Sequence, residues 1–478
     1  MRKMRLLGLM RHGRNRFVNR CLLLFSMASL CLTGYGQPPD IIPESATLLS
    51  EYIQKKSVSG SEKAAGEFLA NICIEKGLVV QKLVSGEKDY NFAASLYPLS
   101  DQLPNIVFLN HIDVVSEGSN VEWKYPPFAG VIAENKVWGR GAIDLKGVAV
   151  MQLLAIEKIK KFAGHTRLPY NITLLCVSGE ESDNSGIIST VENHFEELNA
   201  VVAFGEGGTG VNELSRSNPG QPFYCISVSE KKALWIRLSL GMKTSGHGSV
   251  PPHSYANKEM TLALNKLINR SEKINFNETT TSFFKTIGRH EKGLRRLALR
   301  HPRFFKPFIT RELTRNPLVK STLANTITIT NINTSGLHAN QIAQEIEALL
   351  DCRLLPETDP QAFIEDIRKT LQNPEIKLTI LKETPSAPVS ADDIYFRKFR
   401  ESLEEVYEGS AVLPVMTPAH SDNNFLRQKG VPVYGLTPVL LSREQLLSFH
   451  NSNEYITMQQ LQDGTKVYEK LLYKLVVN

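Results

Sequence analysis

Two adjacent glutamates, Glu180 and Glu181, follow an apolar run that ends at Ser178-Gly179. Residues 170–177 are rich in strand-forming side chains, so we expect a buried strand that stops at the Ser-Gly pair. Two carboxylates side by side at the end of a buried strand repel each other and lose hydration, which a bound cation would offset. An acidic helix N-terminus, which the helix dipole stabilises, is the alternative explanation.

His111 ends a second strand-like run and is followed two positions later by Asp113. A histidine in such a run can simply be a core residue with satisfied hydrogen bonds. The carboxylate of Asp113 could instead accept the second ring N–H of His111 and fix the tautomer that a metal-binding histidine needs. The sequence therefore predicts a metal ligand at His111.

Two more acids lie among glycines. Asp144 follows the turn Gly139-Arg140-Gly141 and precedes a helical run, and Glu206 follows the strand-like run 200–204 at what we expect to be the strand end. The turn has neither the GxxxxGK[ST] nor the GxGxxG spacing, which disfavours a nucleotide-binding loop.

These positions supply nitrogen and oxygen ligands without thiolate. Two histidines and three carboxylates can hold two divalent ions per subunit when one carboxylate bridges them. Such ligands suit Zn²⁺, with Mn²⁺ or Co²⁺ as alternatives, and a bridging hydroxide would neutralise the remaining positive charge. The candidate ligands are His111, Asp144, Glu181, Glu206 and His450, with Glu180 left over.

Strands that end in candidate ligands alternate with helices, which is typical of an open α/β sheet with ligands outside the carboxyl ends of its strands. From about Ser229 the pattern changes to a β-α-β-β-α-β order, which predicts an inserted domain of the split βαβ type. We expect a catalytic domain built from residues 37–228 and 385–478, and a lid domain built from residues 229–384.

A basic and aromatic stretch, residues 283–320, interrupts the lid and contains Phe304, Phe305 and Phe308. Two interpretations stay open. The stretch contacts an anionic membrane surface or acyl chains, or it is a solvated helix pair that covers the lid.

The N-terminus is typical of a targeting segment. Residues 1–20 contain seven arginines and lysines and no acid, and a short apolar run precedes Gly34-Tyr35-Gly36. This predicts a cleaved signal peptide, residues 1–36, and a secreted or periplasmic protein, while the short run disfavours an uncleaved membrane anchor. Without those cations the net charge of +6 becomes slightly negative, so the charge gives no indication of nucleic-acid binding.

Four cysteines follow the signal, and none of them has the close spacing of a metal site. Their apolar surroundings indicate buried thiols, and a disulfide in an oxidising compartment stays open. They are Cys73, Cys176, Cys225 and Cys352.

Six motifs occur in a fixed order along the chain. They are His111-x-Asp113, Gly139-Arg140-Gly141-Ala142-x-Asp144-x-Lys146-Gly147, Gly179-Glu180-Glu181, Glu206-Gly207, Gly246-His247 and His450-Asn451-x-Asn453-Glu454. In this order they resemble the co-catalytic zinc exopeptidases and amidohydrolases, the family of aminoacylase, carboxypeptidase S and succinyl-diaminopimelate desuccinylase. The nearest branch is similar to carboxypeptidase S and the secreted N-acyl-amino-acid hydrolases. The resemblance implies an open mixed sheet with helices on both faces and a ferredoxin-like lid or dimerisation domain.

By this resemblance Asp144 bridges two metal ions. Glu180 is the general base, which takes a proton from the water between the metals and passes it to the leaving amine. Asp113 orients His111. The two implied ligand sets that share Asp144 are His111 with Glu206 and Glu181 with His450.

The resemblance also implies three substrate-facing residues on the lid. His247 would donate to the oxyanion, from its own chain or from a partner in a homodimer. Arg353 would hold a substrate carboxylate, unless it forms a salt bridge with Asp351 instead. Asn340 would lie near the substrate.

Three departures from the family pattern affect details. Gly205 stands before Glu206 where relatives often have an acid, Leu145 replaces a common second acid, and residues 421–424 lack a common substrate-binding arginine. The last departure implies a shifted specificity, and none of the three removes a metal ligand.

We therefore expect a secreted dinuclear zinc hydrolase that cleaves an amide bond next to a free carboxylate, in a small peptide or an N-acyl amino acid. Dipeptidase or aminopeptidase activity is the alternative within the family. A non-catalytic binding or membrane-surface module is the alternative outside it, and the intact set of base and ligands argues against that.

Overall fold

The structure, a computed structural model, describes residues 42–85, 90–118, 122–243, 246–334 and 338–477. The predicted signal peptide, residues 1–36, lies outside these ranges. Within them, no helix is both long enough and apolar enough to cross a membrane.

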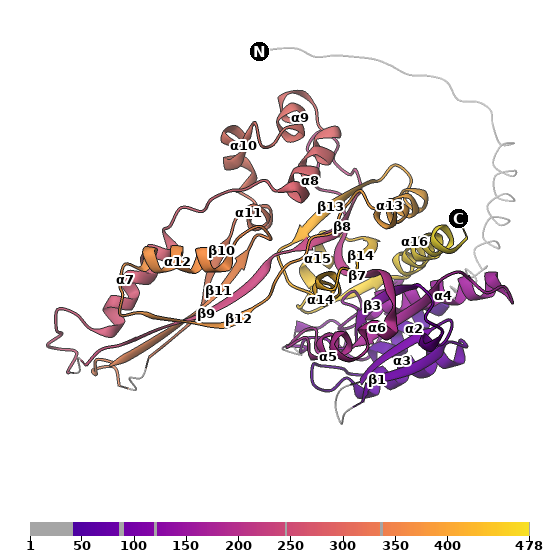
Figure 1. The fold of residues 1–478 in the computed structure, drawn as a ribbon, viewed down its shortest axis with the longest axis horizontal. Helices are drawn as coiled ribbons and strands as arrows, with labels where there is room; N and C mark the ends of the chain where they lie inside the picture. The colour runs from indigo at the N-terminus through magenta and orange to yellow at the C-terminus, as the bar shows by residue number, and fades with distance from the viewer. Residues whose placement is uncertain (1–41, 86–89, 119–121, 244–245, 335–337, 478) are drawn as a thin grey trace, which may run out of the picture. The chain divides into compact units, whose positions relative to one another are not determined.

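The large sheet has eight strands in the spatial order β1-β2-β6-β3-β7-β14-β8-β13 (Figure 1). The central strands β6, β3, β7 and β14 are parallel to one another, and β1 and β2 add an antiparallel edge. This confirms the predicted open mixed sheet. The strands are β1 (Val79–Ser85), β2 (Tyr90–Ser95), β3 (Asn105–His111), β6 (Asn171–Val177), β7 (Ala200–Val211), β8 (Phe223–Glu230), β13 (Ala411–Thr417) and β14 (Val433–Leu440).

The sequence of β3 explains why helices cover both faces. Ile106 and Phe108 pack into one apolar core and Val107 and Leu109 into another, because successive side chains of a strand point to opposite faces. Helices α2 (Glu44–Ile53), α3 (Lys63–Glu75), α4 (Lys146–Ala163), α13 (Ile394–Val406) and α16 (Met458–Val476) close the first core, and α5 (Ser185–Asn193), α6 (Phe195–Leu198) and α14 (Asn423–Gln428) close the second.

The second sheet is antiparallel, with the order β10-β11-β9-β12. It has a separate apolar core, to which alternate residues of β9 such as Leu234 and Ile236 contribute. The order of strands and helices is the β-α-β-β-α-β order expected for the lid, whose limits at residues 229 and 384 stay predictions. The elements are β9 (Lys232–Gly241), α7 (Ala256–Ile268), β10 (Thr326–Thr334), β11 (Glu345–Leu354), α12 (Pro360–Leu371) and β12 (Lys377–Glu383).

The basic stretch 283–320 does not form a helix pair over the lid, so that interpretation is wrong. It contributes to four short helices whose apolar side chains, among them Phe284 and Leu299, pack on Phe223 of β8 and Leu413 of β13. Each of these helices is short, so none of them presents the long apolar face that a pair of long antiparallel helices needs. The helices are α8 (Glu278–Arg289), α9 (Gly293–Arg300), α10 (Lys306–Leu313) and α11 (Pro317–Leu323).

A small antiparallel sheet joins two segments that are distant in sequence. Its order is β15 (Tyr455–Thr457), β5 (Lys136–Trp138) and β4 (Val131–Ala133). The pairing of Tyr455 with Trp138 places the segment after His450 beside the turn that precedes Asp144.

Glu454, next to that pairing, holds the turn. Its carboxylate accepts hydrogen bonds from the backbone N–H groups of Gly141 at 2.9 Å, Ile143 at 2.8 Å and Asp144 at 3.1 Å. Arg140 pairs with the same carboxylate at 2.9 Å, and both side chains are almost fully buried. The position of Asp144 therefore depends on Glu454.

Replacing Glu454 with alanine should reduce the free energy of unfolding by about 3–5 kcal/mol, because it leaves Arg140 as a buried charge without its partner. Urea unfolding followed by circular dichroism measures the change. Glu469→Ala, which removes a partly exposed ion pair with Lys158, is the matched control and should shift the midpoint little. Equal shifts in the two variants would contradict this account of Glu454.

Candidate metal centre and active site

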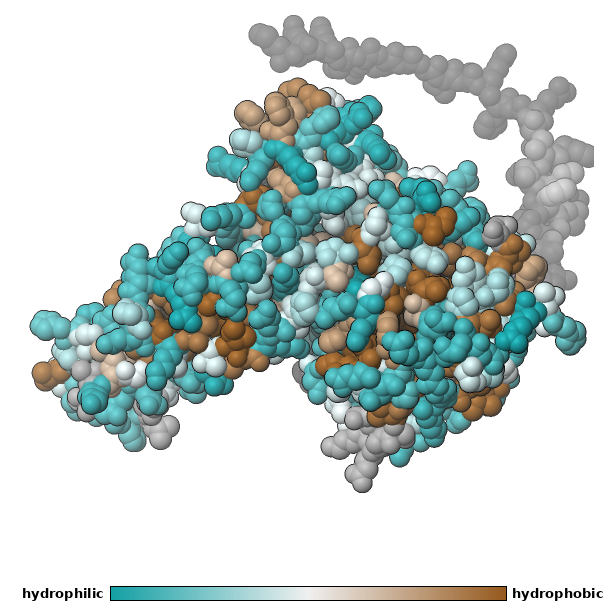
Figure 2. All heavy atoms as spheres, viewed as in Figure 1, coloured by the Kyte–Doolittle hydropathy of each residue, from teal (hydrophilic) through white to brown (hydrophobic). Residues whose placement is uncertain are grey.

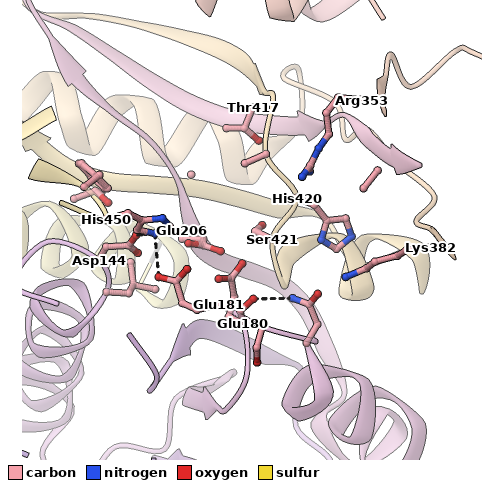
Figure 3. Close-up of a pocket in the computed structure, with 18 of the residues that line it drawn as sticks. Asp144, Glu180, Glu181, Glu206, Arg353, Lys382, Thr417, His420, Ser421 and His450 are labelled. Atoms are coloured by element: carbon pink, nitrogen blue, oxygen red, sulfur yellow. Dashed lines mark hydrogen bonds and ion pairs between the residues drawn. The ribbon is translucent and has the colours of Figure 1, made fainter. Parts of the chain in front are cut away.

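A cavity of about 500 Å³ lies between the large sheet and the lid sheet (Figure 3). One wall carries the acids and His450. The facing wall carries Trp235, Arg353 and Lys382 from the lid strands, and the segment after β13 closes the side. The lid contributes cations and the large sheet contributes anions to the same cavity.

His111 lies at the end of β3, as predicted, and is buried. Its Nε2 is 3.2 Å from Asp144 Oδ1 and 3.7 Å from Glu206 Oε2. Its Nδ1 lies 2.9 Å from the backbone carbonyl oxygen of Asp113, whereas the Asp113 carboxylate is 3.7 Å away. An Nδ1–H donated to that carbonyl leaves Nε2 free to face the acids.

The Asp113 carboxylate has a different set of contacts from the one expected. It accepts the backbone N–H of Glu180 at 3.1 Å, the backbone N–H of Glu181 at 3.0 Å and the hydroxyl of Ser59 at 2.8 Å. Asp113 thus orients His111 through its carbonyl and the glutamate turn through its side chain.

Asp144 lies between the two histidines. Its Oδ1 faces His111, and its Oδ2 is 3.3 Å from His450 Nε2. His450 is also 3.1 Å from Glu181 Oε1 (Figure 3). One carboxylate therefore presents one oxygen to each histidine, which is the arrangement a bridging ligand needs.

Glu206 lies within a strand and not at its end, so that part of the prediction is wrong. β7 continues to Val211, and its register with β14 shifts between Gly435 and Leu436, so that Glu206 and Gly207 are left without partners in the ladder. Such an irregularity re-aims a side chain, here towards His111.

Close packing at position 205 explains why a glycine precedes Glu206. A Cβ at this position would lie 2.0 Å from Asn423 Oδ1. Asn423 approaches so closely because its Nδ2 donates to the carbonyl of Glu206 at 2.7 Å. Glu206 Oε1 is buried and has no hydrogen-bond partner among the described residues, so it is available to a ligand.

The electrostatics indicate an excess of negative charge. Burial and the nearby Glu206 raise the pKa of Glu180 well above its usual value, and burial also raises the pKa of Glu206. Bonds to Asp144 and Glu181 raise the pKa of His450 to about 10. Protons or metal ions would both relieve this repulsion.

The donor set fits divalent ions. Ligand atoms of His111, Asp144 and Glu181 lie within 4.8 Å of one another, as do those of His111, Glu180 and Glu206. All are imidazole nitrogens or carboxylate oxygens, which suit zinc, manganese or cobalt. Geometry alone admits Glu180 as a ligand as well as a base.

The structure brings Arg353 to the cavity but not the other two predicted substrate residues. Arg353 lines the cavity and pairs with Asp351 at 2.8 Å, so the ion pair is present and the binding of a substrate carboxylate stays a prediction. His247 and Asn340 are exposed, lie outside the cavity lining and contact each other at 3.3 Å.

Asp422 and Lys382 are among the residues in or beside the site that were not predicted from the sequence. Asp422 is buried, accepts a 3.0 Å hydrogen bond from Asn184, and has a pKa raised by burial. Lys382 lies 5.0 Å from the ring of Trp235 on the cavity wall. Asp422 stands in the motif at 421–424, which was a usable signal, whereas Lys382 on an alternating strand gives none.

Sequence similarity to known proteins extends over most of the chain. The model of peptidase family M20/M25/M40 matches residues 107–474. The N-fatty-acyl-amino acid synthase/hydrolase PM20D1 of Homo sapiens is 25% identical over 406 residues, which are 82% of this chain and 77% of the human protein. Aminoacylase-1B of Rattus norvegicus is 25% identical over 444 residues, which are 90% of this chain and 95% of the rat protein.

Solved structures share the fold. The M20 family metallo-carboxypeptidase Sso-CP2 of Sulfolobus solfataricus has a TM-score of 0.68 at 19% identity, over 90% of this chain and 98% of that chain. The Bacillus subtilis protein YXEP, described as a dinuclear metal-binding peptidase of the M20 family, has a TM-score of 0.56 at 12% identity, over 91% of this chain and 99% of that chain. The family match, which covers more than half of the chain, leads to one conclusion: the chain belongs to peptidase family M20/M25/M40 and is a hydrolase that acts on amide bonds.

Proposed function

We propose that this protein is a secreted dinuclear zinc hydrolase that cleaves an amide bond next to a free carboxylate. The observation that carries the proposal is the composition of one cavity, in which Glu180 and the candidate ligands face Arg353 and Lys382. We propose His111, Asp144, Glu181, Glu206 and His450 as the metal ligands. Manganese or cobalt would suit the same ligands.

Two divalent ions held by these residues would polarise the scissile carbonyl and lower the pKa of water, so that it can lose a proton and attack near neutral pH. Glu180 accepts the proton of the attacking water and delivers it to the leaving amine. Its position supports this role, because Glu180 lines the same cavity as the candidate ligands Asp144, Glu181 and Glu206. Asp113 keeps Glu180 in place through the backbone.

The substrate carboxylate would bind to the cationic wall. Arg353 presents a planar guanidinium and Lys382 an ammonium to the cavity. Among the described residues, neither of them forms an ion pair with the acids on the opposite wall. The names of the relatives, an N-fatty-acyl-amino acid hydrolase, an aminoacylase and a carboxypeptidase, support a substrate of this kind. Both an N-acyl amino acid and a peptide C-terminus carry the required carboxylate, and a dipeptidase is the alternative.

Replacing Glu180 with glutamine should lower kcat for N-acyl amino acids or dipeptides by about 10³-fold or more, because the amide cannot carry the proton. Two metal ions per chain should remain bound, as measured by elemental analysis. Glu192→Gln, an exposed glutamate on α5, is the matched control and should keep full activity. Full activity of the Glu180 variant would end the proposed mechanism.

We also propose that His247 acts on a partner's site in a homodimer formed through the lid. Its separation from the cavity of its own chain supports this. Mixing two inactive variants, Glu180→Gln and His247→Ala, should restore up to about a quarter of the wild-type activity, since one site of each mixed dimer is complete. If the mixture stays inactive while mixed dimers are present, His247 acts within its own chain.

A membrane-surface contact is proposed for stretch 283–320. Leu294, Phe304 and Phe308 are 86%, 79% and 78% exposed on α9 and at α10, in a stretch rich in arginine and lysine. Figure 2 shows hydrophobic surface among hydrophilic surface over this part of the molecule. Phe304→Ser with Phe308→Ser should reduce co-sedimentation with phosphatidylserine vesicles at least fivefold, and Ile268→Ser on α7 should not. Equal sedimentation of all variants would refute the contact.

A further inference from the structure

A second cavity, of about 460 Å³, lies beside the active-site cavity. Helices α8 and α11 form one wall with Phe283, Leu318 and Val319, and strands β7 and β13 form the floor. The segment after β14 closes it with Leu441 and Leu446. Its lining is mainly aliphatic and aromatic, in contrast to the charged cavity next to it.

Three chain segments pass from one cavity to the other. On β7, Glu206 and Gly207 line the active site and Thr209 and Val211 line the apolar cavity. Thr417, at the end of β13, lines both cavities. The third segment runs from Leu446 in the apolar cavity to Phe449 and His450 in the active site.

Because the two cavities adjoin, a charged lining continues into an apolar one, which matches the polarity of one amphiphilic molecule. Arg353 and Lys382 face the active-site cavity, whereas the cavity beyond Thr417 has a mainly apolar lining. Leu318 is 64% and Leu446 38% exposed on the cavity wall, which leaves apolar surface for an occupant to cover. Glu213 and Arg443 also line the cavity, and they are its only charged residues among those described.

The length of the path distinguishes a long chain from a side chain. Thr209 follows Glu206 by three residues, which is about 10 Å along a strand. An extended chain covers about 3.5 Å for each three bonds, so an aliphatic chain of roughly eight or nine carbons reaches the cavity. The side chain of a peptide residue ends short of it.

We propose that this apolar cavity binds the unbranched acyl chain of an N-acyl amino acid whose amide is cleaved at the metal centre. The proposal rests on the proposed function and specifies its substrate class: amides of long aliphatic acids rather than acetylated amino acids or peptides. Stretch 283–320 thereby contributes α8 and α11 to substrate recognition.

Two variants test the cavity with little risk to folding. Leu318→Asp and Leu446→Asp put charges on partly exposed wall positions, and Ile268→Asp puts the same charge on a 68% exposed isoleucine of α7 outside the cavity. The substrates are N-acyl derivatives of one amino acid with acyl chains of two to sixteen carbons. In the wild type, kcat/KM should increase about fourfold for each methylene that enters the cavity.

The Leu318 and Leu446 variants should lose at least tenfold in kcat/KM for the dodecanoyl substrate but keep the wild-type kcat/KM for the acetyl substrate, while the Ile268 variant should match the wild type for both substrates. An acyl-length dependence that is flat, or that these variants leave intact, overturns the proposal. So does an equal loss for both substrates.

Binding separates this proposal from the proposed function. Calorimetry on Glu180→Gln with the dodecanoyl and acetyl amino acids should give tighter binding of the long chain, which Leu318→Asp removes. Such binding without turnover in the wild type would sink the hydrolase assignment and support the cavity. Lack of binding of the long chain, or tighter binding of a phenylalanyl peptide in its place, overturns the acyl cavity.

Discussion

Four carboxylates, those of Asp144, Glu180, Glu181 and Glu206, share one largely buried space where the strands of the large sheet reach the cavity. Like charges so close together disfavour ionisation, and the raised pKa of Glu180, caused by burial and by Glu206, expresses that cost. Among the described residues, only the two candidate histidines form ion pairs with Asp144, Glu181 and Glu206, and Glu180 forms none. The rest of the structure keeps this repulsive cluster in place for a cation.

Other buried acids of the chain have partners of their own. Glu454 pairs with Arg140 and accepts three backbone N–H groups. Glu230 pairs with Arg427 at 2.9 Å and accepts two hydrogen bonds from Ser421, which fixes the segment that closes the side of the cavity. This difference separates acids that hold the fold from acids that are available for chemistry. Both kinds are needed, because the first kind sets the backbone from which the second kind projects.

The two adjoining cavities divide recognition from reaction. Cations on the lid sheet, acids on the large sheet and apolar side chains on α8 and α11 meet around Thr417, from three separate parts of the chain. Binding an apolar chain and orienting a carboxylate need different side chains, which come from α8 and α11 in the first case and from the lid strands in the second. The helices of stretch 283–320 therefore belong both to the core at β8 and β13 and to the wall of the apolar cavity.

By itself the sequence determined the types of ligand and the strand ends that present them. A strand has a period of two, so an apolar run that stops at His111 or Ser178-Gly179 also predicts where the following side chain points. What only the tertiary structure decided is the distance between segments hundreds of residues apart. Three features arise from packing between distant segments. They are the hydrogen bonds from the Asp144 turn to Glu454, the strand irregularity that directs Glu206 towards His111, and the apolar cavity next to Thr417. No local pattern encodes such distances, because they depend on how whole elements are placed against one another.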